Sequence, residues 1–217
     1  MNLSTFNDLK NECISQNKTI WELTQLEQAQ TSDITIEEVR KTVLNHIEVM
    51  RETIKTGMAS NEKSISNWCG DDCEKLIKRY SKHNALFGKL FQKIITYALA
   101  TSEENLRMGK IVACPTAGSC GIVPAVLVAY SEEYNISNEE QINFLITAGK
   151  IGSIISNKVQ LAGAVAGCQA ECGVAAAMCA GGLAQTMGGT IDEILNAMAL
   201  AMKNLLGLTC DPVCGLV

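Results

Sequence analysis

The sequence predicts an all-α, multi-helix fold with a buried Ala/Gly-rich central helix region. Four capping boxes, in which Thr or Ser is followed three positions later by Glu, indicate helix starts. Apolar residues recur at intervals of three and four, as on one face of a helix. The sequence has no run of alternating apolar and polar residues bounded by hairpin turns, which argues against a sheet. The four boxes are Thr19/Glu22, Thr35/Glu38, Ser137/Glu140 and Thr190/Glu193.

The second box begins an amphipathic helix that we expect to end near Gly57. Its apolar stripe comprises Ile36, Val39, Val43, Ile47, Met50 and Ile54. A Gly/Ser/Asn-rich stretch over 57–67 then breaks the pattern and is typical of a loop. We therefore expect an N-terminal helical unit over 1–60 packed on a second domain over 61–217, with a single domain over 1–217 as the alternative.

A second helical pattern covers 85–105, and 111–115 is too short to establish a strand. The small-residue loop 115–121 leads into an apolar helix in which Pro124 is tolerated in the first turn. Backbone N–H groups at such a helix start suit a phosphate or a carboxylate, although an ordinary capped loop has the same composition. No Gly-Lys-Ser/Thr follows, so this is not a Walker loop.

Between Val159 and Ile191 the only charged residue is Glu171. The Ala/Gly composition, the glutamines and the lack of an aromatic belt argue against a membrane span. A buried central helix fits better, or two helical arms that meet near Gly181 and Gly182. Gly163 and Gly167 would allow neighbouring helices to approach closely, and a buried Glu171 would need a partner or a raised pKa.

Charge and cysteine content exclude several classes of protein. The net charge of −5 and the scattered basic residues argue against a nucleic-acid partner. No export signal is visible at the N-terminus, so we expect a cytoplasmic protein in which the ten cysteines are thiols, metal ligands or buried apolar residues. No Cys-x-x-Cys knuckle occurs, which disfavours a zinc ribbon.

Most of the cysteines are expected to be small buried residues. This applies to Cys13, Cys114, Cys120, Cys172 and Cys179. Cys210 differs because it follows Gly-Leu-Thr and precedes Asp-Pro, a sequence that ends a helix and starts a turn.

Three motifs in order resemble the α chain of bacterial iron–sulfur L-serine dehydratases, and the likeness covers most of the chain. They are Pro-Thr-Ala-Gly-Ser-Cys-Gly-Ile-Val-Pro-Ala-Val-Leu over 115–127, Gly-Cys-Gln-Ala-Glu-Cys-Gly over 167–173 and Cys-Asp-Pro-Val-Cys-Gly-Leu-Val over 210–217. The likeness extends back through Tyr-Ala-Leu-Ala-Thr-Ser-Glu over 97–103.

The resemblance implies a helical catalytic domain that holds a [4Fe–4S] cluster through three cysteines and leaves one iron open. Cys168 and Cys210 correspond to two of these ligands. The family pattern places the third eleven positions after Cys210, four residues past Val217. We therefore expect a C-terminally truncated catalytic domain that lacks one ligand.

The resemblance also implies that L-serine is converted to pyruvate and ammonia. The open iron acts as a Lewis acid on the substrate hydroxyl while a base removes the α-proton. Thr116, Ala117, Gly118 and Ser119 correspond to the loop that receives the substrate carboxylate. His46 and His83 are the only histidines, and neither lies in a catalytic pattern, so we expect a separate β subunit to supply the base.

Several alternatives stay open at this point. Cys214 or Cys172 could replace the missing ligand. The only argument for Cys214 is that it lies four positions after Cys210. A related cluster-dependent cysteine desulfidase would use the same motifs, and this truncated chain could be a cluster-free inactive helical fragment. Preference between serine and threonine and assembly into a homo-oligomer are not fixed by the sequence.

Overall fold

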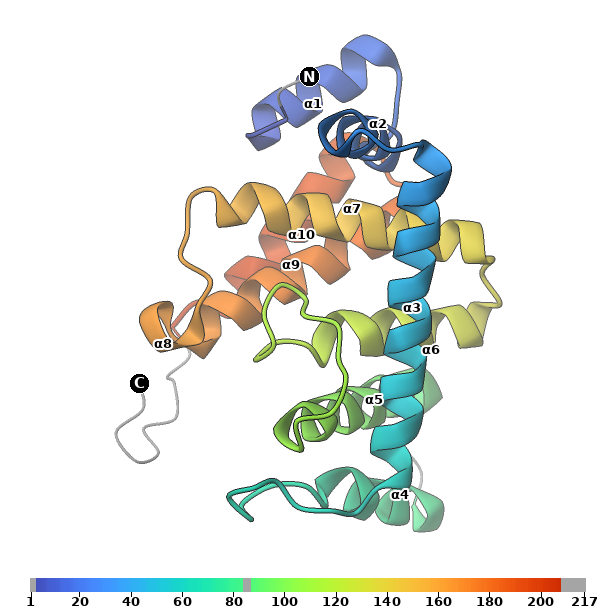
Figure 1. Ribbon diagram of the computed structural model, residues 1–217, viewed down its shortest axis with the longest axis vertical. Helices are drawn as coiled ribbons and strands as arrows, with labels where there is room; N and C mark the ends of the chain where they lie inside the picture. Colours follow the sequence, from blue (N-terminus) through green and yellow to red (C-terminus); the bar gives the residue numbers. More distant parts are fainter. Residues whose placement is uncertain (1–2, 84–86, 208–217) are drawn as a thin grey trace. The chain divides into compact units, whose positions relative to one another are not determined.

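The computed structural model describes residues 3–83 and 87–207, which form ten α-helices and no strand (Figure 1). The all-α prediction is confirmed for these residues. The helices are α1 (Phe6–Gln16), α2 (Ile20–Ser32), α3 (Ile36–Ala59), α4 (Asp72–Lys82), α5 (Gly88–Leu106), α6 (Ile122–Tyr134), α7 (Asn138–Ser156), α8 (Gly163–Ala166), α9 (Cys168–Thr186) and α10 (Ile191–Lys203).

The chain forms two compact units. One consists of Met1–Asn45 with Asn138–Val217, and the other of His46–Ser137. The first unit therefore combines helices from both ends of the chain, and the boundary falls within α3. A division into 1–60 and 61–217 stays a prediction.

The helix starts follow the capping boxes. Thr19 and Thr190 cap α2 and α10, and in both cases the glutamate three positions later accepts a hydrogen bond from the backbone N–H of the capping residue. Glu38 does the same for Thr35 before α3. Helix α7 begins one residue after Ser137, where the fourth box predicts it. Each such cap contributes on the order of 1 kcal/mol.

In the first unit α9 packs against α7 and α10, drawn in Figure 1 as the orange, yellow and red ribbons. Glycines make this close packing possible. A Cβ on Gly182 would lie 2.9 Å from the ring of Phe144, and one on Gly181 would overlap the side chain of Ile151. Helix α9 runs unbroken through both glycines. The buried central helix is therefore confirmed, and the alternative of two arms meeting at Gly181 and Gly182 is wrong because the facing side chains fill the space over them.

The buried residues of α9 include Glu171, the one charge of this segment. Within the residues that the structure describes, no helix is both long and apolar enough to cross a membrane.

In the second unit α5 packs against both α4 and α6. The C-terminal half of α3 meets α5 at Gly57, where an added Cβ would overlap the carbonyl oxygen of Ala100 and lie 2.7 Å from its carbonyl carbon. The apolar stripe is buried at Ile47, Met50 and Ile54. The expected helix end near Gly57 is thus close to the observed end at Ala59.

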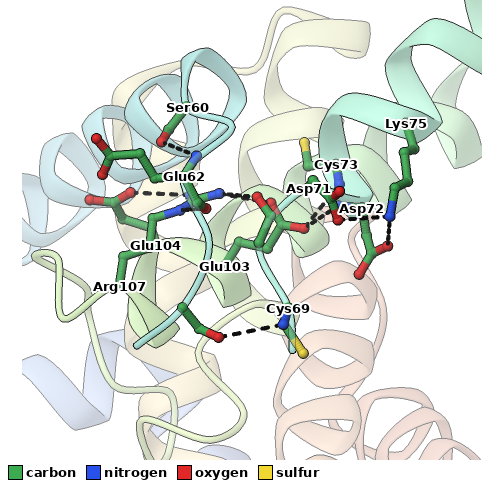
Figure 2. A network of polar contacts seen from close by, with 12 residues as sticks. Ser60, Glu62, Cys69, Asp71, Asp72, Cys73, Lys75, Glu103, Glu104 and Arg107 are labelled. Atoms are coloured by element: carbon green, nitrogen blue, oxygen red, sulfur yellow. Dashed lines mark hydrogen bonds and ion pairs between the residues drawn. The ribbon is translucent and has the colours of Figure 1, made fainter. Parts of the chain in front are cut away.

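A polar network fixes the loop between α3 and α4 (Figure 2). The Glu103 carboxylate on α5 accepts hydrogen bonds from the backbone N–H groups of Asp72 and Cys73, at 2.7 and 3.0 Å. Arg107 donates to the carbonyl oxygens of Glu62 and Gly70 and pairs with Glu103 at 3.1 Å. This arrangement gives α4 an N-terminal cap from another helix.

Candidate functional site

The predicted anion-binding loop lies between α5 and α6 in the second unit. The Ser119 hydroxyl donates to the carbonyl oxygen of Cys114 at 3.1 Å, and the Thr116 hydroxyl oxygen lies 3.2 Å from that of Ser119. Ser119 is only 2% exposed. Its side chain therefore holds the loop together from inside, a role that the sequence motif does not reveal.

The tip of the loop is accessible to a ligand. Ala117 and Gly118 are exposed, and within the described part of the chain their backbone N–H groups have no hydrogen-bond partner in the protein. Both residues precede the N-terminus of α6, where the helix dipole favours negative charge. The local geometry suits a carboxylate or another small anion.

Helix α5 positions this loop from one side. The side-chain amide of Asn105 donates to the carbonyl oxygen of Ala117 at 3.1 Å. At the other end of the loop, a Cβ on Gly121 would lie 2.5 Å from the hydroxyl oxygen of Ser102 and 2.7 Å from the carbonyl oxygen of Ala98. The sequence did not predict these contacts, because the helical pattern over 85–105 does not indicate that its last turns lie next to the loop.

Cys168 occupies the first position of α9 in the first unit and is exposed. The preceding Gly167 has φ of 79°, a left-handed conformation that glycine adopts without strain. Cys168 has the exposure that a cluster ligand requires.

The buried cysteines contrast with Cys168. Cys13, Cys114, Cys120 and Cys179 are buried as predicted, whereas Cys172 is half-buried. Burial raises the pKa of Cys114 to about 12 and, with smaller contributions from nearby glutamates, that of Cys13 to about 11. Both thiols are thereby held in the protonated form that does not bind metal.

The second predicted ligand, Cys210, and the alternative Cys214 lie outside the described residues. Among residues 3–83 and 87–207, no group of three or more His, Cys, Asp or Glu side chains could hold a metal ion. Thr116 and Ser119 are brought together by their hydroxyls, as described above. The assignments of Cys168, Cys210 and residues 116–119 to ligand and substrate binding stay predictions.

The two histidines occupy surface positions. His46 lies on α3 and His83 follows the last residue of α4, and both are exposed. The identity of the base, and its supply by a separate β subunit, stay predictions.

The described residues thus form an all-helical protein with an exposed thiol at the start of α9 and an exposed loop before α6. Comparison with known protein families gives a match over residues 15–217 to the family model described as the serine dehydratase alpha chain. The chain belongs to this family.

Two relatives extend over nearly the whole chain. The L-serine dehydratase alpha chain of Peptoniphilus asaccharolyticus is 36% identical over 215 residues, which cover 99% of this chain and 74% of the relative. The probable L-serine dehydratase alpha chain of Bacillus subtilis strain 168 is 37% identical over 211 residues, or 92% and 70%. L-serine dehydratase TdcG of Escherichia coli K12 is 47% identical over 122 residues, 56% of this chain and 27% of the relative.

Proposed function

We propose that this chain is the catalytic α subunit of an L-serine dehydratase, a lyase that converts L-serine to pyruvate and ammonia. The observation that carries the proposal is the likeness along 99% of the chain to a protein named as the alpha chain of this enzyme. The motif at 115–127 contains an exposed loop, to which we assign binding of the substrate carboxylate. The motif at 167–173 contains an exposed thiol, to which we assign ligation of the cofactor.

The cofactor that we propose is a [4Fe–4S] cluster. Cys168 would be one of its ligands, with Cys210, which lies outside the described residues, as the second. Thiolates are the usual ligands of such clusters, and the exposure of Cys168 supports this assignment. When bound, the cluster supplies a Lewis acid that makes the substrate hydroxyl a better leaving group.

The chain's own contribution to substrate binding is the loop 116–119. We assign carboxylate binding to the backbone N–H groups of Ala117 and Gly118, which have no hydrogen-bond partner among the described residues and precede the positive end of α6. Ser119 acts indirectly, because its hydroxyl is buried and bonded to Cys114. Thr116 is half-buried and borders the same surface.

The partner that we propose is a β subunit that supplies the base for removal of the α-proton. This agrees with the surface positions of His46 and His83. The enzyme would work in the cytoplasm, as expected from the sequence.

Anaerobic reconstitution with iron and sulfide tests the proposal. The chain would be combined with the β subunit of the same source and assayed for pyruvate from L-serine, with L-threonine and L-cysteine as competing substrates. We expect cluster absorbance and pyruvate release from L-serine. Release of sulfide and pyruvate from L-cysteine with no reaction of L-serine would replace the proposal by a desulfidase, and no turnover of any substrate would reject it.

A further inference from the structure

Glu171 is a buried carboxylate one helical turn after Cys168. It is the only charged residue between Val159 and Ile191, and it is 6% exposed. Burial of a carboxylate is costly unless other interactions compensate for it, so a residue of this kind in an Ala/Gly-rich segment calls for a specific structural role.

The Glu171 carboxylate packs against Gly163, the first residue of α8. A Cβ on Gly163 would lie 2.9 Å from Oε1 and 3.2 Å from Cδ of Glu171. The carboxylate thus occupies the space that a side chain on Gly163 would fill. A side chain on Gly163 would therefore have to displace the Glu171 carboxylate from this position.

Helix α8 buries little apolar surface. None of its four residues is buried, and Ala164, Val165 and Ala166 are exposed. Helix α8 packs against α9, and the contact between Gly163 and Glu171 is part of this packing.

The position of α8 determines the position of Cys168. One residue, Gly167, connects the two, and its N–H donates to the carbonyl oxygen of Gly163 at 2.9 Å. The carbonyl oxygen of Gly167 in turn accepts from the N–H of Ala170 at 3.1 Å. A shift of Gly163 would be transmitted through Gly167 to the start of α9.

We propose that Glu171 is a positioning residue that, through its contact with Gly163, sets the backbone conformation at Cys168. The significance of this for the cluster rests on the proposed function, in which Cys168 is a ligand. The contact itself depends on the volume of the side chain, so glutamine should replace glutamate and alanine should not.

The experiment compares Glu171→Ala, Glu171→Gln and Gly163→Ala with the unaltered chain. Gly149→Ala is the matched control, because Gly149 is exposed on α7 and a Cβ there meets nothing within 4 Å. Three quantities are measured: the maleimide labelling rate of Cys168 in the cluster-free chain, iron and sulfide content after reconstitution, and the electron paramagnetic resonance spectrum of the reduced cluster.

We expect the labelling rate of Cys168 to change at least about threefold in Glu171→Ala and Gly163→Ala, because the backbone that holds this exposed thiol at the start of α9 becomes less ordered. Their iron content should fall and their resonance spectrum should change, while Glu171→Gln and Gly149→Ala stay near the unaltered chain. Unchanged labelling in folded Glu171→Ala and Gly163→Ala would overturn the proposal. So would a Glu171→Gln variant that behaves like Glu171→Ala, or loss of helical circular dichroism in Glu171→Ala.

A Cys168→Ala variant separates this proposal from the proposed function. Full iron and sulfide content in that variant would show that Cys168 is not a ligand and would reject the cluster assignment. The labelling rates of the cluster-free variants would still decide whether Glu171 positions Cys168.

Discussion

The guanidinium of Arg107 and the carboxylate of Glu103 form an ion pair of 3.1 Å in which the two side chains are only 7% and 4% exposed (Figure 2). Removal of one member of a buried pair leaves the other charge without compensation, which costs about 3–5 kcal/mol. We therefore expect Arg107→Ala to lower the free energy of unfolding by roughly this amount. Urea unfolding followed by circular dichroism measures the change.

An exposed ion pair on α4 provides the control for this prediction. Lys75 pairs with Asp71 at 2.7 Å, but its side chain is 62% exposed. Lys75→Ala should therefore lower the free energy of unfolding much less than Arg107→Ala does. Equal losses from Arg107→Ala and Lys75→Ala would show that the buried network does not stabilise the loop between α3 and α4.

Gly57 should tolerate no side chain, because its Cα faces the backbone of Ala100 on α5. Backbone atoms cannot move aside as the end of a flexible side chain can, so Gly57→Ala would separate α3 from α5. We expect a loss of about 2 kcal/mol or more in the free energy of unfolding. Gly149→Ala, at an exposed helical position with open space, should instead gain about 0.5–1 kcal/mol. Thermal denaturation of the two variants would contradict the prediction if both shifted in the same direction.

Stability should decrease at alkaline pH because of the buried thiols. The pKa of Cys114 rises from its ordinary value of 9.0 to about 12, chiefly by burial and secondarily by the proximity of Cys120. Between these values the unfolded chain ionises at this position and the folded chain does not. Its contribution to stability is thus complete below pH 9 and is lost as the pH rises toward 12.

At pH 10 the loss from Cys114 amounts to about 1.4 kcal/mol. Urea midpoints at pH 8 and pH 10 measure the effect, and Cys114→Ala should show a smaller decrease between the two pH values than the unaltered chain. An equal decrease in both proteins would mean that the thiol does not ionise differently on unfolding.

Capping boxes predicted four of the ten helix starts in the part of the chain that the structure describes. The boxes at Thr19, Thr35 and Thr190 each involve hydrogen bonds over three residues, so the sequence contains all of the information. The continuity of α9 through Gly181 and Gly182 was not predictable in this way. The side chains that face these glycines, Phe144 and Ile151, come from another helix, so the local sequence does not show that the glycines serve close packing.

The same distinction applies to the candidate site. The motif at 167–173 drew attention to Cys168, which is exposed at the start of α9, and its role as a ligand stays a prediction. The inward hydroxyl of Ser119 and the contact between Glu171 and Gly163 depend on how the loops fold, which the residue types alone do not specify. Glu103 reaches backbone N–H groups 30 and 31 residues away, a relationship that no local pattern indicates.

Asn105 should influence substrate binding without contributing to the chemistry. Its side-chain amide holds the carbonyl oxygen of Ala117 at 3.1 Å, next to the N–H groups that we assign to carboxylate binding. Loss of one such hydrogen bond is worth about 1 kcal/mol, which corresponds to roughly a fivefold change in affinity. In the reconstituted enzyme we therefore expect Asn105→Ala to raise KM for L-serine about fivefold with a smaller change in kcat. The control is Asn196→Ala at an exposed position of α10. If KM for L-serine stayed the same in Asn105→Ala at full iron content, the loop would not be the carboxylate site.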